Sequence, residues 1–243
     1  MRIPIAAAIL GLSLIVAFAL AGAAFKYRSR SGETIVVTGL AERNFVSDRA
    51  VWQGSYARKS MDLQAAYRDL KSDETTIRRY LQGRGVSVVE IVFSAVQINR
   101  EFSPRTNERG MEISQEFTGY SLSQTVKVQS NDVNKVEQLS REATDIIQSG
   151  IEFNSSAPEY FYSKLSDIKV DLLGKASSDA RLRAQTIAKN AGGSLGDLKK
   201  ANMGVFQITG QNSNEDYSYG GAFNTTDKNK TGSITIKMEF AID

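Results

Sequence analysis

The C-terminal stretch Ser233-Ile-Thr-Ile-Lys-Met-Glu-Phe-Ala-Ile242 alternates large apolar side chains with polar or small ones. Successive side chains of a β-strand point to opposite faces of a sheet, so this alternation predicts a strand with one buried face. The side chains expected on that face are Ile234, Ile236, Met238, Phe240 and Ile242. Such a strand needs neighbouring strands and a covering layer, which the rest of the chain must supply.

Three helices are predicted from apolar residues that recur near every 3.6 positions. They are expected over Met61–Gln82, after a capping residue at Asn131, and over Asp167–Ala191. The second helix has an apolar stripe of Val133, Val136, Leu139, Ala143 and Ile147. Each helix therefore has a face with which it can cover a sheet.

Runs rich in β-branched and aromatic residues predict further strands. These are expected at Glu33–Glu42, Phe45–Arg58, Val86–Phe102, Glu116–Gln129, Ile151–Tyr162 and Leu198–Thr209. The order of elements is then ββαββ followed by αβαββ. Helices that interrupt hairpin-connected strands are typical of an α+β fold with mainly antiparallel sheet.

Two long polar stretches are predicted as loops. Ser103–Ser114 is expected to join two strands as a hairpin loop, and Gly210–Lys230 is rich in Asn, Ser, Gly and Asp. The second loop carries the aromatic residues Tyr217, Tyr219 and Phe223, which form a candidate site for a subunit or partner contact. Removal of residues 212–228 is expected to leave the fold intact, because shortening a loop changes its closure entropy only slightly.

Composition restricts the classes of function. The 243 residues are 41% hydrophobic, which suits a folded core and argues against disorder. The net charge of +3 comes from the N-terminus, where Arg2, Lys26, Arg28 and Arg30 precede the first acidic residue. Residues 31–243 therefore carry a charge of −1, and no nucleic-acid partner is expected.

The chain has neither cysteine nor histidine. The missing cysteines exclude disulfides, thiol nucleophiles and thiolate zinc sites. The missing histidines remove the commonest general base and the commonest transition-metal ligand. We therefore expect no cofactor, no metal and no catalytic residue.

The N-terminal run from Ile3 to Phe25 contains no charged residue and is followed at once by a basic flank. A helix needs roughly 20 apolar residues to cross a bilayer, so residues 1–30 are predicted to be a membrane anchor. Its lipid-facing residues are expected to include Ile3, Leu10, Ile15, Phe18 and Phe25. The alternative is a secretory signal with a cleavage site at Ala21-Gly22-Ala23. The distribution of basic residues alone would place the C-terminal side in the cytoplasm.

Partial catalytic motifs have simpler structural interpretations. Ser166-Asp-Ile-Lys169 and Lys230-Thr-Gly232 match pieces of the serine penicillin-recognising enzymes, but they also fit a helix start and a turn into a strand. Gly192-Gly193 follows a helix, which indicates a helix C-cap and not a phosphate loop. The remaining catalytic option is a pair of convergent carboxylates.

Several stretches together resemble bacterial SIMPL-domain proteins. The N-terminal stretch is Val37-Thr-Gly-Leu-Ala-Glu-Arg-Asn-Phe-Val-Ser-Asp-Arg-Ala-Val-Trp52. The C-terminal stretches are Tyr160–Lys169, Ala176–Ala184, Asn190-Ala-Gly-Gly193 and Ala201–Phe206. Val170 departs from a proline that is common in the family after the matching lysine. The resemblance covers nearly all of residues 33–243.

This resemblance implies an envelope protein of a Gram-negative bacterium, with residues 31–243 forming one SIMPL-like α+β domain. It places that domain in the periplasm, tethered to the inner membrane by a single pass or associated with the outer membrane. The family implies large homo-oligomers and no established enzymatic activity. We therefore expect a non-enzymatic scaffold or binding module, with envelope stress or integrity as its setting. Its partners would be the bilayer, other copies and an unidentified envelope protein. The alternative is a histidine-free, carboxylate-based hydrolase that acts on envelope polymer.

Overall fold

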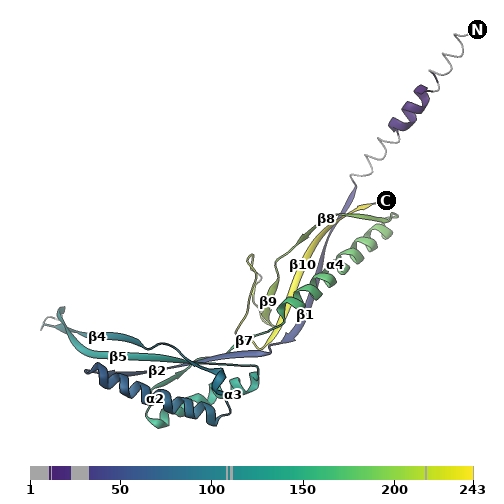
Figure 1. The fold of residues 1–243 in the computed structure, drawn as a ribbon. Helices are drawn as coiled ribbons and strands as arrows, with labels where there is room; N and C mark the ends of the chain where they lie inside the picture. Colours follow the sequence, from purple (N-terminus) through teal and green to yellow (C-terminus); the bar gives the residue numbers. More distant parts are fainter. Residues whose placement is uncertain are drawn as a thin grey trace, which may run out of the picture.

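The computed structural model describes residues 11, 13–22, 33–107, 109, 112–216 and 218–242. These residues form two mainly antiparallel sheets, each packed against helix, in an elongated and bent molecule (Figure 1). We call residues 34–46 together with 165–242 the terminal lobe, and residues 49–161 the central lobe. The predicted α+β class with mainly antiparallel sheet is confirmed.

The terminal lobe has the strand order β1 (Thr34–Val46), β10 (Asn229–Ile242), β8 (Leu195–Met203), and β9 (Gln207–Gly210) also pairs with β10. Strand β10 lies between its neighbours, as its sequence predicts. Ile234, Ile236, Met238 and Phe240 are buried in the core of this lobe. The alternation therefore identified the buried face correctly.

Helix α4 (Leu165–Asn190) covers the β1–β10 side of that sheet. Its buried stripe in the second half consists of small residues spaced by four, namely Ala176, Ala180, Ala184 and Ala188. Small side chains let the helix backbone come close to the sheet. At Gly39 of β1, an added Cβ would overlap the carbonyl oxygen of Ala176 and lie 2.6 Å from the backbone nitrogen of Ala180.

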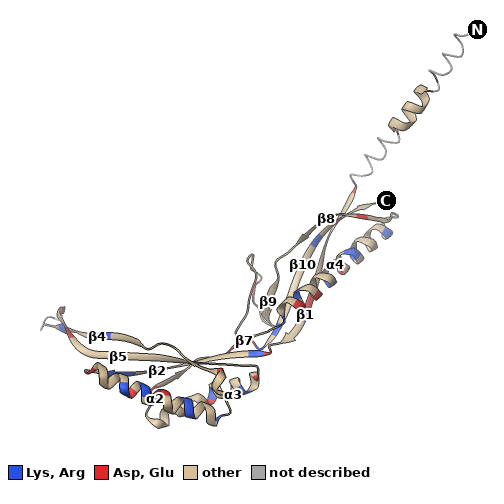
Figure 2. Cartoon of the chain, in the orientation of Figure 1, with Lys and Arg blue, Asp and Glu red and all other residues tan. Residues whose placement is uncertain are grey.

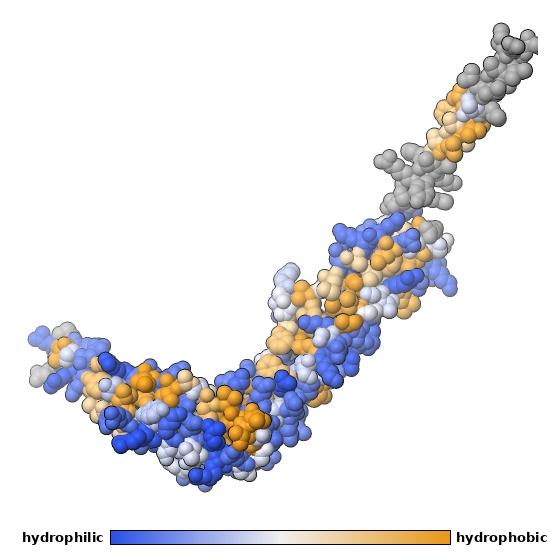
Figure 3. Space-filling model, in the orientation of Figure 1, coloured by the Kyte–Doolittle hydropathy of each residue, from blue (hydrophilic) through white to orange (hydrophobic). Residues whose placement is uncertain are grey.

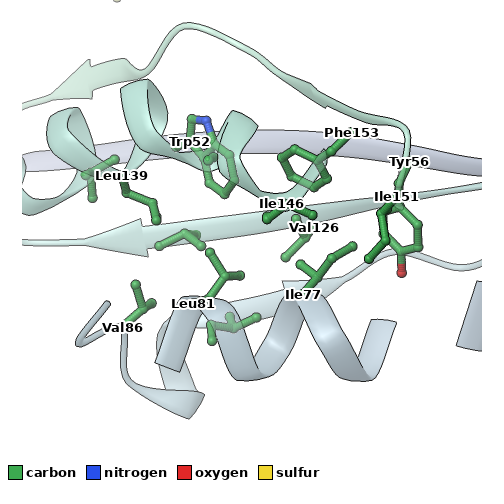
Figure 4. Packing of buried hydrophobic residues seen from close by; sticks show 14 of the residues in the cluster. Trp52, Tyr56, Ile77, Leu81, Val86, Val126, Leu139, Ile146, Ile151 and Phe153 are labelled. Carbon is green, nitrogen blue, oxygen red and sulfur yellow. The ribbon is translucent and has the colours of Figure 1, made fainter. Parts of the chain in front are cut away.

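The central lobe has the strand order β3 (Ile91–Phe93), β5 (Glu112–Ser130), β2 (Arg49–Ser60), β6 (Phe153–Ser155). Strand β4 (Gln97–Thr106) also pairs with β5, and β7 (Glu159–Phe161) also pairs with β2. Helices α2 (Leu63–Gly83) and α3 (Val133–Glu142) cover this sheet. Trp52, Ile77, Leu81, Val126 and Phe153 lie in the core between these layers (Figure 4).

Several predicted boundaries are wrong. Strand β1 runs through Gly39 to Val46, so the chain leaves one sheet for the other at Ser47-Asp48. The predicted strand Val86–Phe102 is instead a 3₁₀ turn (Val88–Glu90) followed by the separate strands β3 and β4. Most of the predicted loop Ser103–Ser114 is strand, because β4 and β5 stay paired from Gln97↔Ser123 to Thr106↔Glu112. This part of the ribbon lies beyond the end of β2, where water reaches both faces, so its sequence lacks the alternation of a half-buried strand.

The second helix also differs from its prediction. Asp132, and not Asn131, caps α3 by accepting a hydrogen bond from Lys135 N at 3.0 Å. After Ala143 the chain tightens into a 3₁₀ segment (Ala143–Ser149), so Ile146 is buried and Ile147 is exposed.

Two other predicted strands are each divided. The segment 151–162 forms β6 and β7, with Pro158 between them, and the segment 198–209 forms parts of β8 and β9. Proline has no backbone N–H to donate to a sheet, which explains the first interruption. At the second interruption the ladder to β10 shifts, and Gly204 N donates to Thr235 O at 2.8 Å.

Residues 13–22 of the N-terminal run are helical, and Ile15 and Phe18 are 67% and 72% exposed there. Ile3, Leu10 and Phe25 lie outside the described residues. Within the described part of the chain, no helix is both long and apolar enough to span a membrane.

Candidate interaction surface

The junction between the lobes is closed by the segment that follows β9. Lys228 O accepts a hydrogen bond from Ser47 N at 2.9 Å, and Thr225 O accepts one from Tyr160 N at 2.7 Å. The Lys228 ammonium also reaches α3, where it lies 3.1 Å from Glu137 Oε2. The 211–228 segment therefore ties the terminal lobe to the central lobe.

Gln207 of β9 holds the first part of this segment. Its side chain is buried, and its Nε2 donates to Ser218 O at 2.8 Å. Its Oε1 accepts from the backbone N–H groups of Ser218 and Ala222. Ile208 adds backbone bonds to Ala222 and Asn224, so this segment pairs with β9 like a short extra strand.

A buried lysine holds the second part. Lys230 of β10 is buried, and its ammonium donates to the backbone and side-chain oxygens of Asn224. Asn224 in turn donates to Asp227 Oδ2 at 2.8 Å and to Glu215 Oε1 at 2.6 Å. Glu215 also accepts from Gly210 N at 2.9 Å. One network of polar side chains thus fixes the path of the loop.

The charges in this network shift two pKa values in known directions. Burial lowers the pKa of Lys230, while Asp227 and Glu215 act in the opposite direction. The hydrogen bond from Gly210 N, followed by the one from Asn224, lowers the pKa of Glu215. Glu215 is therefore held as a carboxylate, the form that the two donors require.

These contacts argue against the expectation that residues 212–228 are dispensable for the fold. Their removal would leave the buried Lys230 ammonium without the Asn224 and Asp227 oxygens. A buried charge without a partner is strongly unfavourable, and this cost is much larger than the change in closure entropy. Sequence reasoning missed Gln207 and assigned Lys230 only to a turn into the last strand, because the loop that supplies their partners folds back from positions that no local pattern links to them.

A pocket of about 420 Å³ lies between the loop and the sheet of the terminal lobe. Its lining includes Leu40, Val205, Gln207, Ile234 and Tyr219. Tyr219 is fully exposed, so its ring is available for contact.

The structure does not gather the three aromatic residues of the predicted contact loop into one site. Tyr219 lines the pocket beside Leu40, whereas Phe223 lies at the lobe junction beside Phe45 and Tyr160. Tyr217 lies outside the described residues.

The two outer edges of the terminal sheet differ. Strands β1 and β8 both pair with β10 on one side, and neither has a further strand among the described residues. On the outer edge of β1, the N–H of Leu40 donates to Asp179 Oδ2 of α4 at 2.9 Å. Strand β8 is exposed from Asp197 to Met203.

Exposed apolar side chains accompany these edges. Val36 and Leu40 of β1, Leu198 and Met203 of β8, and Val205 after β8 are all large and exposed. The space-filling view shows apolar surface on the visible face of this lobe (Figure 3). An edge strand with apolar side chains offers both backbone and side-chain contacts to another chain.

The partial catalytic motifs have packing roles. Lys230 belongs to the loop network, and Gly232 makes room for Phe206 and Phe45, whose ring atoms would lie 3.0 and 3.3 Å from an added Cβ. Lys169 lies over the Phe206 ring at 5.3 Å. Ala191 is the C-cap residue of α4, and Gly192 after it has a φ of +83°, in agreement with the predicted glycine at the end of this helix.

The carboxylates with the clearest contacts are paired. Asp73 is buried and accepts two bonds from Arg58, and Glu74 is paired with Lys71 and Arg78. Within the described residues, no group of three or more acidic side chains is placed to hold a metal ion.

The fold and its surface define a two-lobed α+β protein with exposed sheet edges. Residues 35–240 match the family model SIMPL, described as a protein of unknown function (DUF541). This match spans both lobes and most of the chain, so the chain belongs to the SIMPL family. The resemblance recognised from the sequence is thereby confirmed. No curated protein matches the chain.

Proposed function

We propose that this protein is a membrane-anchored, self-assembling scaffold or binding module of the bacterial cell envelope and that it has no catalytic activity. The anchor is supported by the uncharged run from Ile3 to Phe25 and its basic flank. Periplasmic placement of the domain follows the family resemblance. The observation that carries self-assembly is the pair of exposed strand edges on the terminal lobe.

These two edges are suited to each other. Strand β1 pairs with β10 from Gly39↔Ile236 to Thr34↔Ala241, and β8 pairs with the same stretch from Met203↔Ile236 to Leu195↔Ile242. Both strands are antiparallel to β10, so β1 and β8 run in the same direction. They also begin at the end of the lobe where the anchor joins. Copies anchored in one membrane are related by rotations about the membrane normal, which preserve height and direction. The β8 edge of one copy would then meet the β1 edge of the next in parallel register.

This arrangement is heterologous and repeats from copy to copy, so it generates rings when the rotation closes. The Leu40 N–H already donates to Asp179. The earlier part of β1, including Val36, can still pair with a strand of another copy. No observation on the described residues favours the alternative hydrolase. Among the described residues, the lining of the 420 Å³ pocket includes no carboxylate, and Asp73 and Glu74 are in ion pairs.

The test is the oligomeric mass of the full chain in mild detergent, with Ala201→Pro as the probe of the β8 edge. Gly204 N–H points to β10 and N–H directions alternate along a strand, so the Ala201 N–H points outward. Proline is tolerated where a strand N–H faces solvent, so the variant should fold and lose assembly. Ala201→Val keeps the N–H and is the matched control. A wild-type chain that stays monomeric at high concentration overturns the proposal.

The anchor has its own test. The full chain should remain in the membrane pellet after high-salt and alkaline washes. Ile15→Arg should release it, because an arginine near the bilayer centre costs about 2.5–3.5 kcal/mol on insertion scales. An intact mass that begins at Ala24 would show a cleaved signal instead.

A further inference from the structure

Basic residues gather at one end of the terminal lobe. The sequence from Arg181 to Met203 contains five basic residues and one acidic residue. The preceding part of α4, residues 165–180, contains two basic and three acidic residues. In Figure 2 basic residues mark the C-terminal half of α4. Within the stretch from α4 to β8, the excess of positive charge therefore lies after Arg181.

This is the end of the lobe from which the chain continues toward its N-terminal run. Leu195, the first residue of β8, pairs with Ile242, and Thr34, the first residue of β1, pairs with Ala241. Helix α4 ends at Asn190, so the short α4–β8 turn lies at this same end (Figure 1).

The distance to the predicted anchor is short. Glu33 lies eight positions after Phe25, and eight steps along an extended chain span at most about 29 Å. The end of the lobe that holds Thr34 therefore stays within reach of the lipid headgroups.

Exposed aliphatic side chains accompany the basic ones. Ile187 lies two residues before Lys189 in the last turns of α4, and Leu198 directly precedes Lys199 and Lys200 on β8. All five side chains are exposed. Among the described residues, the ion pairs of α4 lie further back along the helix and use Lys175, Arg183 and Arg43. We call Ile187, Lys189, Leu198, Lys199 and Lys200 the basic end.

We propose that the basic end docks on the anionic headgroups of the membrane that holds the anchor. Lysine near an anionic bilayer is attracted to the surface, and aliphatic neighbours add contact at the headgroup boundary. Docking holds the terminal lobe against the bilayer and gives the exposed edges of neighbouring copies one common height. This inference rests on the membrane anchor of the proposed function.

Because the natural chain has no cysteine, a single introduced cysteine can carry a label at one chosen position. Asn190→Cys, at the end of α4, carries an environment-sensitive fluorophore in the full chain reconstituted into phosphatidylcholine vesicles, with or without phosphatidylglycerol. Thr75→Cys on α2 of the central lobe is the control label. The emission maximum of the fluorophore at position 190 should shift to shorter wavelength only when phosphatidylglycerol is present. Its emission should also be quenched by nitroxide lipid only in those vesicles. High salt should abolish the response, because it screens exposed charges.

Charge reversal supplies the second comparison. Lys189→Glu, Lys199→Glu and Lys200→Glu combined should remove the response at position 190. Reversal of the exposed Arg68 and Arg79 on α2 should leave it unchanged. If the chain floats with the vesicles, either of two results overturns the inference. One is an equal response on neutral and anionic vesicles, and the other is an unchanged response of the triple variant. A chain that does not float with either vesicle overturns the anchor as well.

Discussion

The carboxylate of Asp179 accepts a hydrogen bond of 2.9 Å from the backbone N–H of Leu40. Asp179 lies in α4, and Leu40 lies on the outer edge of β1, where no strand in the described part of the chain takes that donor. The same carboxylate is paired with Arg183 at 2.8 Å. The bond from Leu40, followed by the contact with Arg183, lowers the pKa of Asp179. The helix therefore occupies one donor of an otherwise open edge.

Asp179→Ala should expose this edge donor and increase self-association. The Leu40 amide should exchange faster with solvent in the monomer, as measured by hydrogen exchange. Association should increase with concentration in analytical ultracentrifugation. Arg183→Ala is the control, because it removes the ion pair but keeps the acceptor of the Leu40 bond. If Arg183→Ala associates as strongly as Asp179→Ala, the hydrogen bond between Leu40 and Asp179 does not limit self-association through the β1 edge.

Substitution of two glycines by alanine should change the free energy of unfolding in opposite directions, because one faces α4 closely and the other is open to solvent. Gly39→Ala should destabilise the terminal lobe by about 1–3 kcal/mol or more, because the new Cβ meets the α4 backbone at Ala176 and Ala180. Gly174→Ala should stabilise α4 by about 0.5–1 kcal/mol, because nothing lies within 4 Å of its added Cβ. Urea denaturation measures both changes. Effects of the same sign would contradict the packing described here.

The buried face of β10 predicts a large effect of side-chain truncation. Phe240 is 3% exposed in the core of the terminal lobe, so Phe240→Ala should cost about 3–5 kcal/mol of unfolding free energy. Phe102→Ala on the projecting β4–β5 ribbon should cost about 1 kcal/mol, because that half-exposed ring mainly loses its edge contact with Phe117. Chemical denaturation of the two variants compares them directly. A loss below about 1 kcal/mol for Phe240→Ala would mean that its ring is not in the core.

Acid should loosen the 211–228 segment. The pKa of Glu215 is lowered in the folded chain, so its bonds to Gly210 and Asn224 stabilise the fold above the ordinary carboxyl value of 4.5. That contribution is lost as the pH falls through the lower folded pKa. The Gly210 amide signal in NMR should titrate with a midpoint below 4.5. Glu215→Gln keeps an acceptor and should abolish the titration, whereas a wild-type midpoint at or above 4.5 would refute the assignment.

Local sequence patterns predicted the helices and strands that have one buried and one exposed face. The C-terminal strand is half-buried along its length, so its alternation identified Ile236, Met238 and Phe240 as core. The three helices were located to within a few residues because each has one apolar face on a sheet. The far end of the β4–β5 ribbon was predicted as the loop Ser103–Ser114, because both of its faces meet water beyond β2, which removes the period-two signal.

The sequence by itself determined the class of fold, the family, the absence of cysteine and histidine chemistry, and an N-terminal run long and apolar enough to be an anchor. Only the tertiary structure decided that the chain forms two lobes, with β1 leaving its neighbour β2 to pair with β10. Thr34 Oγ1 donates to Glu239 Oε1, 205 positions away. Pairing at such a separation depends on which edges and faces remain uncovered after the rest of the chain has packed, and no local period records it. The same reason applies to the exposed β8 edge and to the buried Lys230, whose roles come from neighbours that are distant in the sequence or folded back by a loop.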